Sequence, residues 1–288
     1  MEIQRKERKD GEKVTVKYYS IAGITVKMRL EKDEPPQMFR RFEAEKPSGG
    51  AAVNVDIYWH EHLFHQWYGL DYCQSEKDFP HLFISRKTPG VRLQADRAWE
   101  HLVIEGAACG MEGVMEVFLA AFYSRLSYHR GILVHASCIS WKEEGVIFTA
   151  PSGTGKTTQA ELWKKYRDAE ILNGDKVILE CREEEIRAWG SPWKGSSPYA
   201  VNRSVPLRAV IVLEQGKENR IRKLTGEETT AKFFPHVFYP SWSEVCVAEV
   251  MWSMDVLVRK VPVYFLSCLP DSDAVELVRR TVWGDEEK

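Results

Sequence analysis

The sequence has no long hydrophobic run. Nowhere in its 288 residues do about 18 apolar residues follow one another, which is the length that a membrane-spanning helix needs. It also has little net charge: the chain contains 40 Lys and Arg residues and 42 Asp and Glu residues, which gives a formal net charge of −2. A nucleic-acid-binding protein usually carries a basic surface. We therefore expect neither a membrane nor a nucleic acid as a partner.

Cysteines are few and widely spaced. The chain has six, with no C-x-x-C pair, and most of them lie among apolar neighbours, as Cys246 and Cys268 do. This pattern favours buried free thiols in a reducing compartment. The first residues mix charges of both signs and lack the apolar core of a signal peptide. We expect a cytoplasmic protein.

Two catalytic patterns are missing. The segment His60–His65 holds three histidines, but the helical metalloprotease pattern H-E-x-x-H would need a histidine where Phe64 stands. No G-x-S-x-G motif surrounds Ser137, Ser152 or Ser191. The sequence therefore predicts neither a zinc centre nor a serine hydrolase.

The first hundred residues read as strands. Apolar and polar residues alternate over 13–19 and 24–30, with Ala22-Gly23 as a turn between them, and again over 53–59, 81–85 and 91–95. This predicts a mostly antiparallel sheet. From Met111 to Tyr128 the apolar residues recur at helical spacing. The length allows about two domains, and we place them at 1–108, a β-rich portion, and 109–288, an α/β domain.

The most informative segment is Ala150–Thr157, with the sequence APSGTGKT. It has the form of a Walker A loop, with alanine in place of the usual first glycine. An apolar run at Val146–Phe148 precedes it and a helical segment at Lys156–Tyr166 follows it. Small residues let successive backbone N–H groups turn toward one point, and the helix N-terminus adds partial positive charge. The segment predicts a site for nucleotide phosphates.

Each residue of this loop has an expected role. Lys156 reaches the β- and γ-phosphates and the Thr157 hydroxyl binds Mg²⁺. We expect the nucleotide to contact a set of loop and helix residues: Ser152, Gly153, Thr154, Gly155, Lys156, Thr157 and Thr158.

Two residues outside the loop are candidates for the same site. Asp175 lies in the turn-like break Asn173-Gly174-Asp175, where a carboxylate could hold Mg²⁺ or take a proton. His135 lies on an apolar strand and would face the phosphates if that strand pairs beside the loop strand. Each of these residue types also occurs in turns and cores without any function.

The order of His135, the Walker A loop and the Asn-Gly-Asp turn resembles the kinase domain of HPr kinase/phosphorylase, whose fold is shared with phosphoenolpyruvate carboxykinase. The segments Trp189–Gly195 and Val261–Tyr264 add to this resemblance, which covers about residues 110 to 288. It implies an α/β P-loop kinase domain of this type behind a β-rich N-terminal portion. The implied reaction is transfer of the ATP γ-phosphoryl group to a serine hydroxyl.

The sequence departs from that family at one acid. The family carries two adjacent aspartates at the turn, one resembling a base and the other a metal partner. Here Gly174 replaces the first and Asp175 keeps the second. Either Asp175 serves alone, or His135 does the proton work, or the chain binds nucleotide without efficient transfer. The family's glutamate-containing signature is also not recognisable around Lys194, which either contacts phosphate or acceptor or is merely solvated.

We therefore expect a phosphotransferase that uses ATP and Mg²⁺, with Asp175, His135 and Lys156 as catalytic residues and Thr157 and Asp175 at the metal. The acceptor is a hydroxyl, of serine in a peptide or protein or of a small molecule. The alternative is a degenerate, nucleotide-binding regulatory protein. Carboxykinase chemistry is disfavoured because no arginine cluster for a carboxylate substrate can be picked out. A homo-oligomer is compatible with this sequence.

Overall fold

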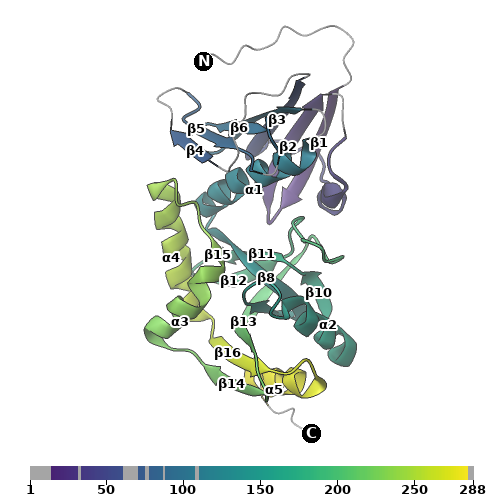
Figure 1. The fold of residues 1–288 in the computed structure, drawn as a ribbon, viewed down its shortest axis with the longest axis vertical. Coiled ribbons are helices and arrows are strands. Elements are labelled where there is room, and N and C mark those ends of the chain that lie inside the picture. The colour runs from purple at the N-terminus through teal and green to yellow at the C-terminus, as the bar shows by residue number, and fades with distance from the viewer. Residues whose placement is uncertain are drawn as a thin grey trace. The chain divides into compact units, whose positions relative to one another are not determined.

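The computed structural model describes residues 14–31, 34–60, 71–74, 78–86, 88–107 and 110–284, and it is a mixed α/β structure (Figure 1). The chain divides into two compact units. The first comprises Met1–Ser20 and Ile24–Phe122, and the second Ile21–Gly23 and Tyr123–Lys288. Within the described ranges no helix is long and apolar enough to cross a membrane.

The first unit is built on a seven-stranded sheet in the order β1-β2-β3-β7-β6-β5-β4. Its strands are β1 (Val14–Ile21), β2 (Ile24–Glu31), β3 (Val53–His60), β4 (Asp71–Gln74), β5 (His81–Ile84), β6 (Arg92–Ala95) and β7 (His101–Ala107). The pairs from β4 to β7 are antiparallel, but β2–β3 and β3–β7 are parallel. Three of these five pairings are antiparallel, which agrees with the expected mostly antiparallel sheet, and the two parallel pairings at its centre were not expected. The chain between β2 and β3, which includes the 3₁₀ helix η1 (Gln37–Phe42), is long enough for the crossover that a parallel pair requires.

Apolar residues on one face of this sheet form the core of the first unit. In β2 the side chains of Val26, Met28 and Leu30 are fully buried while their neighbours are not. Helix α1 (Met111–Tyr128) spans the residues predicted from periodicity, and the division between the units falls within it. Its Phe118 packs against Phe39 of η1, with 6.0 Å between the ring centroids.

The second unit contains a nine-stranded sheet that two long strands hold together, β8 (Gly131–Trp141) and β13 (Ser204–Gln215). The other strands are β9 (Glu144–Thr149), β10 (Glu170–Asn173), β11 (Lys176–Cys181), β12 (Ile186–Trp189), β14 (Arg220–Lys223), β15 (Val237–Phe238) and β16 (Val263–Cys268). The first half of β8 pairs with β11 and β15, and its second half pairs with β9 and β10. The change of partner falls between His135 and Ala136.

Helices cover both faces of the central strands. Helices α2 (Lys156–Arg167) and α5 (Ser272–Trp283) pack on one face, where Phe148, Ile211 and Trp163 share a cluster. Helices α3 (Gly226–Phe233) and α4 (Glu244–Lys260) pack on the other, with Ile147 and Val210. Because alternate residues of β9 and β13 face opposite layers, both sets must be apolar. This explains why 146–148 reads as an unbroken apolar run.

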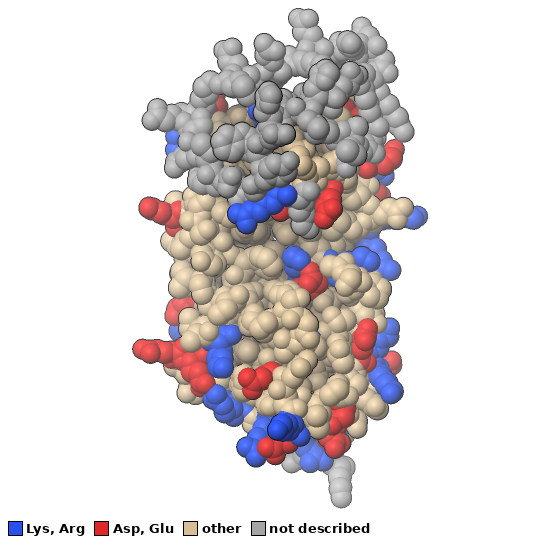
Figure 2. Space-filling model, viewed as in Figure 1, with Lys and Arg blue, Asp and Glu red and all other residues tan. Residues whose placement is uncertain are grey.

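Charged residues lie on exposed loops, and residues of both signs are mixed on the surface. Residues 182–185, the run Arg-Glu-Glu-Glu, are exposed at the turn between the antiparallel strands β11 and β12. On the face drawn in Figure 2, Lys and Arg are interspersed with Asp and Glu, and neither sign forms a broad patch.

Candidate functional site

The loop between β9 and α2 has the backbone that its glycines predict. Gly153 has φ +79° and Gly155, the residue before the helix, has φ +112°. Side chains larger than hydrogen are rarely found at such angles. Ala150 is buried, Ser152, Gly153 and Thr158 are exposed, and Thr154, Gly155 and Thr157 are half-buried. A strand therefore leads into a tight loop that opens a helix.

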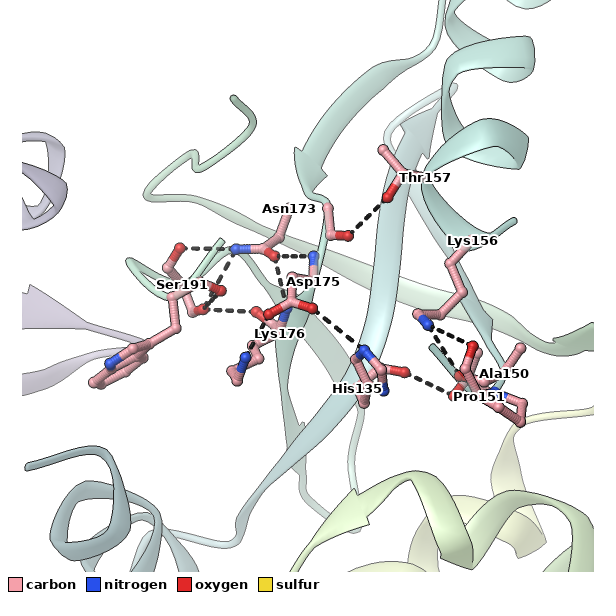
Figure 3. A network of polar contacts seen from close by, with 12 residues as sticks. His135, Ala150, Pro151, Lys156, Thr157, Asn173, Asp175, Lys176 and Ser191 are labelled. Carbon is pink, nitrogen blue, oxygen red and sulfur yellow. Dashed lines mark hydrogen bonds and ion pairs between the residues drawn. The ribbon is translucent and has the colours of Figure 1, made fainter. Parts of the chain in front are cut away.

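Lys156 is held inside this loop. Its side chain is only 6% exposed, and its Nζ donates to the carbonyl oxygens of Ala150 and Pro151, at 3.0 and 3.1 Å (Figure 3). Burial lowers the pKa of Lys156, while the charge of Asp175 opposes that shift and the charge of Lys176 adds to it. A buried ammonium that only carbonyls contact is well suited to an anion.

The first turn of α2 is tied to the Asn173-Gly174-Asp175 turn. The Thr157 hydroxyl donates to the carbonyl of Gly174, at 3.1 Å, and the Ser137 hydroxyl of β8 donates to the carbonyl of Lys156, at 2.8 Å. These bonds bring together three segments that are separate in the sequence: 135–137, 150–157 and 173–176 (Figure 3). The predicted site residues His135, Lys156, Thr157 and Asp175 all belong to them.

Asn173 sets the shape of the turn. Its Oδ1 accepts hydrogen bonds from the backbone N–H groups of Asp175 and Lys176, at 2.8 and 2.9 Å, and its Nδ2 donates to the carbonyl of Ser191, at 2.8 Å. The side chain is fully buried. A short polar side chain that bonds the backbone two residues ahead is typical of such turns. Asn173 thus fixes where the Asp175 carboxylate begins.

Asp175 lies between two basic side chains. Its Oδ1 is 3.3 Å from Nε2 of His135, and its Oδ2 accepts a hydrogen bond from Nζ of Lys176. Burial alone would raise the pKa of Asp175, but the hydrogen bonds and charges of His135 and Lys176 outweigh it and lower the pKa from 3.8 to about 2. The carboxylate is therefore anionic at neutral pH. No motif of the sequence predicts Lys176 as part of the site, and its position next to Asp175 is the one signal for it.

A second loop lies over this turn. A Cβ on Gly174 would lie 2.1 Å from Oγ and 2.5 Å from Cβ of Ser197, and a Cβ on Gly195 would lie 2.9 Å from Cγ of Asp175. Ser197 therefore fills the space where an acidic side chain at 174 would begin. Lys194 is half-buried, and its amine makes no hydrogen bond or ion pair with the described part of the chain. Nothing in local sequence patterns signals the contact between Ser197 and Gly174.

The other candidates from the sequence are the histidine segment, the cysteines and Ser191. His60 ends β3, and the remainder of the 60–65 segment lies outside the described residues. Among the residues that the structure places, no group of three or more His, Cys, Asp or Glu could hold a metal ion. Cys138, Cys181 and Cys246 are buried free thiols, as expected, and Cys268 is a free thiol that is only half-buried. Ser191 serves the turn: its hydroxyl donates to the carbonyl of Lys176, at 2.6 Å.

Fold and site together define a mixed α/β protein with a strand–loop–helix element beside an Asp–His pair. Residues 111–271, more than half of the chain, match the model of the family described as SynChlorMet cassette protein ScmC. The chain belongs to this family. No curated protein matches it.

Solved structures are also similar. One is the Hpr(Ser) kinase/phosphatase from Coxiella burnetii, which is 12% identical, with a TM-score of 0.33. The match covers 52% of this chain and 94% of the other. A TM-score this low is no evidence for a shared activity.

Proposed function

We propose that the chain is an ATP-dependent phosphotransferase that transfers the γ-phosphoryl group to a hydroxyl, of serine in a peptide or protein or of a small molecule. The observation that carries the proposal is the meeting of Lys156, Thr157, Asp175 and His135 around one turn. Phosphoryl transfer depends on positioning and electrostatic stabilisation, so a short list of residues is enough. The domain that acts is 109–288, with 1–108 as a separate β-rich portion.

The loop supplies the nucleotide end of the site. Backbone N–H groups of residues 152–158 and the N-terminus of α2 would face the phosphates, because φ values of +79° and +112° at Gly153 and Gly155 turn the chain around one point. Lys156 would exchange the carbonyls of Ala150 and Pro151 for phosphate oxygens. A carbonyl oxygen is a weaker hydrogen-bond acceptor for the ammonium group of Lys156 than the charged oxygen of a phosphate is.

The residues present fit Mg²⁺. This ion usually keeps several waters and takes one or two carboxylates besides the phosphates, so the lack of a larger ligand cluster in the described chain is no obstacle. Asp175 is anionic, and Thr157 is joined to the turn that carries it. These two would hold the ion, which when bound neutralises charge on the phosphates. His135 would orient the acceptor, since its ring is fixed by Asp175.

A second function has one specific observation in its favour. Gly174 stands where the resemblance to HPr kinase/phosphorylase implies an additional aspartate, and Ser197 fills the space that a side chain at 174 would enter. A protein that binds nucleotide and presents a partner, without transfer, would have no need of that acid. The two functions make opposite predictions about turnover.

The test is transfer of label from ATP radiolabelled at the γ-phosphate, with Mg²⁺, to a pool of serine-containing peptides and to cell extract. Lys156→Ala and Asp175→Asn should each abolish labelling. Lys165→Ala is the matched control, since Lys165 is exposed on the same helix, and it should label like wild type. Lys156-dependent ATP binding without any labelling would favour the binding protein, and absence of both would overturn the nucleotide site itself.

A further inference from the structure

His236 lies next to the site although it is distant in sequence. It ends the 3₁₀ helix η2 (Phe234–His236), one residue before β15. Strand β15 pairs with β8 in antiparallel register, Val237 opposite Val134 and Phe238 opposite Leu133. His236 directly precedes Val237, as His135 directly follows Val134, so this pairing brings His236 close to His135, and the charges of His135 and Lys156 both act on its ring. Lys176 pairs with His135 from the other side.

Three basic residues thus come together beside β8: His236, His135 and Lys176. Lys176 lies directly opposite His135, and such residues of neighbouring strands have their side chains on the same face, with Cβ atoms about 5 Å apart. His135 and Lys176 already contact a partner, because both lie against the carboxylate of Asp175. The ring of His236 makes no hydrogen bond or ion pair with the residues that the structure describes.

The surroundings of His236 keep its ring uncharged. Burial lowers the pKa of His236 from its usual 6.5, and the charges of His135, from β8, and Lys156, from the start of α2, lower it further. Helix α3 also packs against η2, and its Lys232 lies over the ring of Phe265, at 4.7 Å. At neutral pH one ring nitrogen therefore carries a free electron pair.

The other two candidates for a base are poorly suited. Both carboxylate oxygens of Asp175 are engaged, one by His135 and the other by Lys176. His135 has Nε2 turned to that same carboxylate. His236 is therefore a third candidate for the group that takes the proton of the acceptor.

We propose that His236 is the general base of the phosphoryl transfer proposed above. A ring nitrogen of His236 takes the proton of the acceptor's hydroxyl while the hydroxyl oxygen bonds to the γ-phosphorus. The bond from that phosphorus to the bridging oxygen breaks, and ADP leaves with the electron pair. This inference rests on the proposed function, and Asp175 and His135 keep their roles of holding Mg²⁺ and orienting the acceptor.

The experiment compares wild type with His236→Gln, which keeps a polar side chain of similar length but has no basic nitrogen. Binding of a fluorescent ATP analogue and single-turnover transfer of γ-labelled phosphate, to water and to a randomised serine-peptide pool, are measured across pH 5 to 9. The expected result is a dissociation constant within about twofold of wild type and transfer that is about 10²–10⁴-fold slower. The wild-type rate should fall as His236 gains a proton at low pH, and that fall should be absent in His236→Gln.

His101→Gln is the control for loss of a histidine, since His101 is exposed on β7 of the first unit. Near-UV circular dichroism and the retained nucleotide affinity show that the variant is folded. Transfer within threefold of wild type would overturn the base and leave the proposed function standing. Weaker nucleotide binding with unchanged transfer would make His236 a phosphate ligand instead. A wild type that binds ATP and transfers nothing would overturn both proposals.

Discussion

Gly174 allows the sharpest test of the packing at the site. Its hydrogen faces Ser197, and the Cβ of an alanine there would lie 2.1 Å from Ser197 Oγ and 2.5 Å from Ser197 Cβ. Ser197 is only 8% exposed, and its Oγ accepts a hydrogen bond from the backbone N–H of Tyr199, at 3.1 Å. The serine therefore has little room to move away. Inserting one methyl group into such a place costs about 1–3 kcal/mol.

Substitutions of Ser197 test whether its atoms are the cause of the destabilisation expected for Gly174→Ala. Ser197→Gly removes both clashing atoms and loses one hydrogen bond, about 1 kcal/mol. Ser197→Ala removes only Oγ and leaves Cβ at 2.5 Å. We expect Gly174→Ala to lower the free energy of unfolding by about 2 kcal/mol in wild type and by less than about 0.5 kcal/mol in Ser197→Gly.

The assay is urea denaturation followed by tryptophan fluorescence, on wild type, the three single variants and both double variants. The coupling between 174 and 197 follows from the double-mutant cycle. A Gly174→Ala protein as stable as wild type would refute this reasoning, and so would rescue by Ser197→Ala that equals rescue by Ser197→Gly. The expected loss of stability in Gly174→Ala would show that an acid at 174 cannot be restored by one substitution.

Three further outcomes are expected at the same turn. The pKa of Asp175 is lowered from 3.8 to about 2 in the folded state, so its charge stabilises the fold above pH 3.8, and this stabilisation is lost as the pH falls toward 2. Asp175→Asn should therefore lower the free energy of unfolding by about 2 kcal/mol at neutral pH. The difference from wild type should shrink as the protein is titrated with acid. Asn173→Ala should cost about 2–3 kcal/mol in urea denaturation, because two backbone N–H groups and the Ser191 carbonyl lose their partner; a cost below about 0.5 kcal/mol would count against its role. Gly195→Ala should combine strain from φ +57° with a contact of 2.9 Å to Asp175, so we expect a lower melting temperature and weaker Mg²⁺-dependent ATP binding by calorimetry, and unchanged values for both would contradict it.

Local patterns predicted the elements of this fold well. Helical spacing over 111–128 and the apolar run before the loop each correspond to an element of the structure, α1 and β9. They are visible in sequence because every turn of a helix and every pair of strand residues repeats the same demand for burial. The turn at Asn173–Asp175 follows from side-chain chemistry that acts within three residues.

Long-range register could not be predicted in this way. The parallel pairs β2–β3 and β3–β7 depend on which strands meet, and alternation within one strand looks the same in either direction. Ser197 packs against Gly174, 23 positions away in the chain, and His236 lies close to His135, 101 positions away. The site could be named in part from its loop, but the residues that surround Asp175 appear only when the strands are paired.

Strand β9 lies between β8 and β13, and its Val146, Ile147 and Phe148 are fully buried. Its partner β13 ends at Gln215, so on the ribosome the apolar edge of β9 waits roughly 3–13 s for that strand to be made. An unpaired apolar edge recruits strands of other chains. A shortened polypeptide that keeps the loop and Asp175 but stops before Gln215 should therefore precipitate, and chaperones should bind the growing chain over this interval.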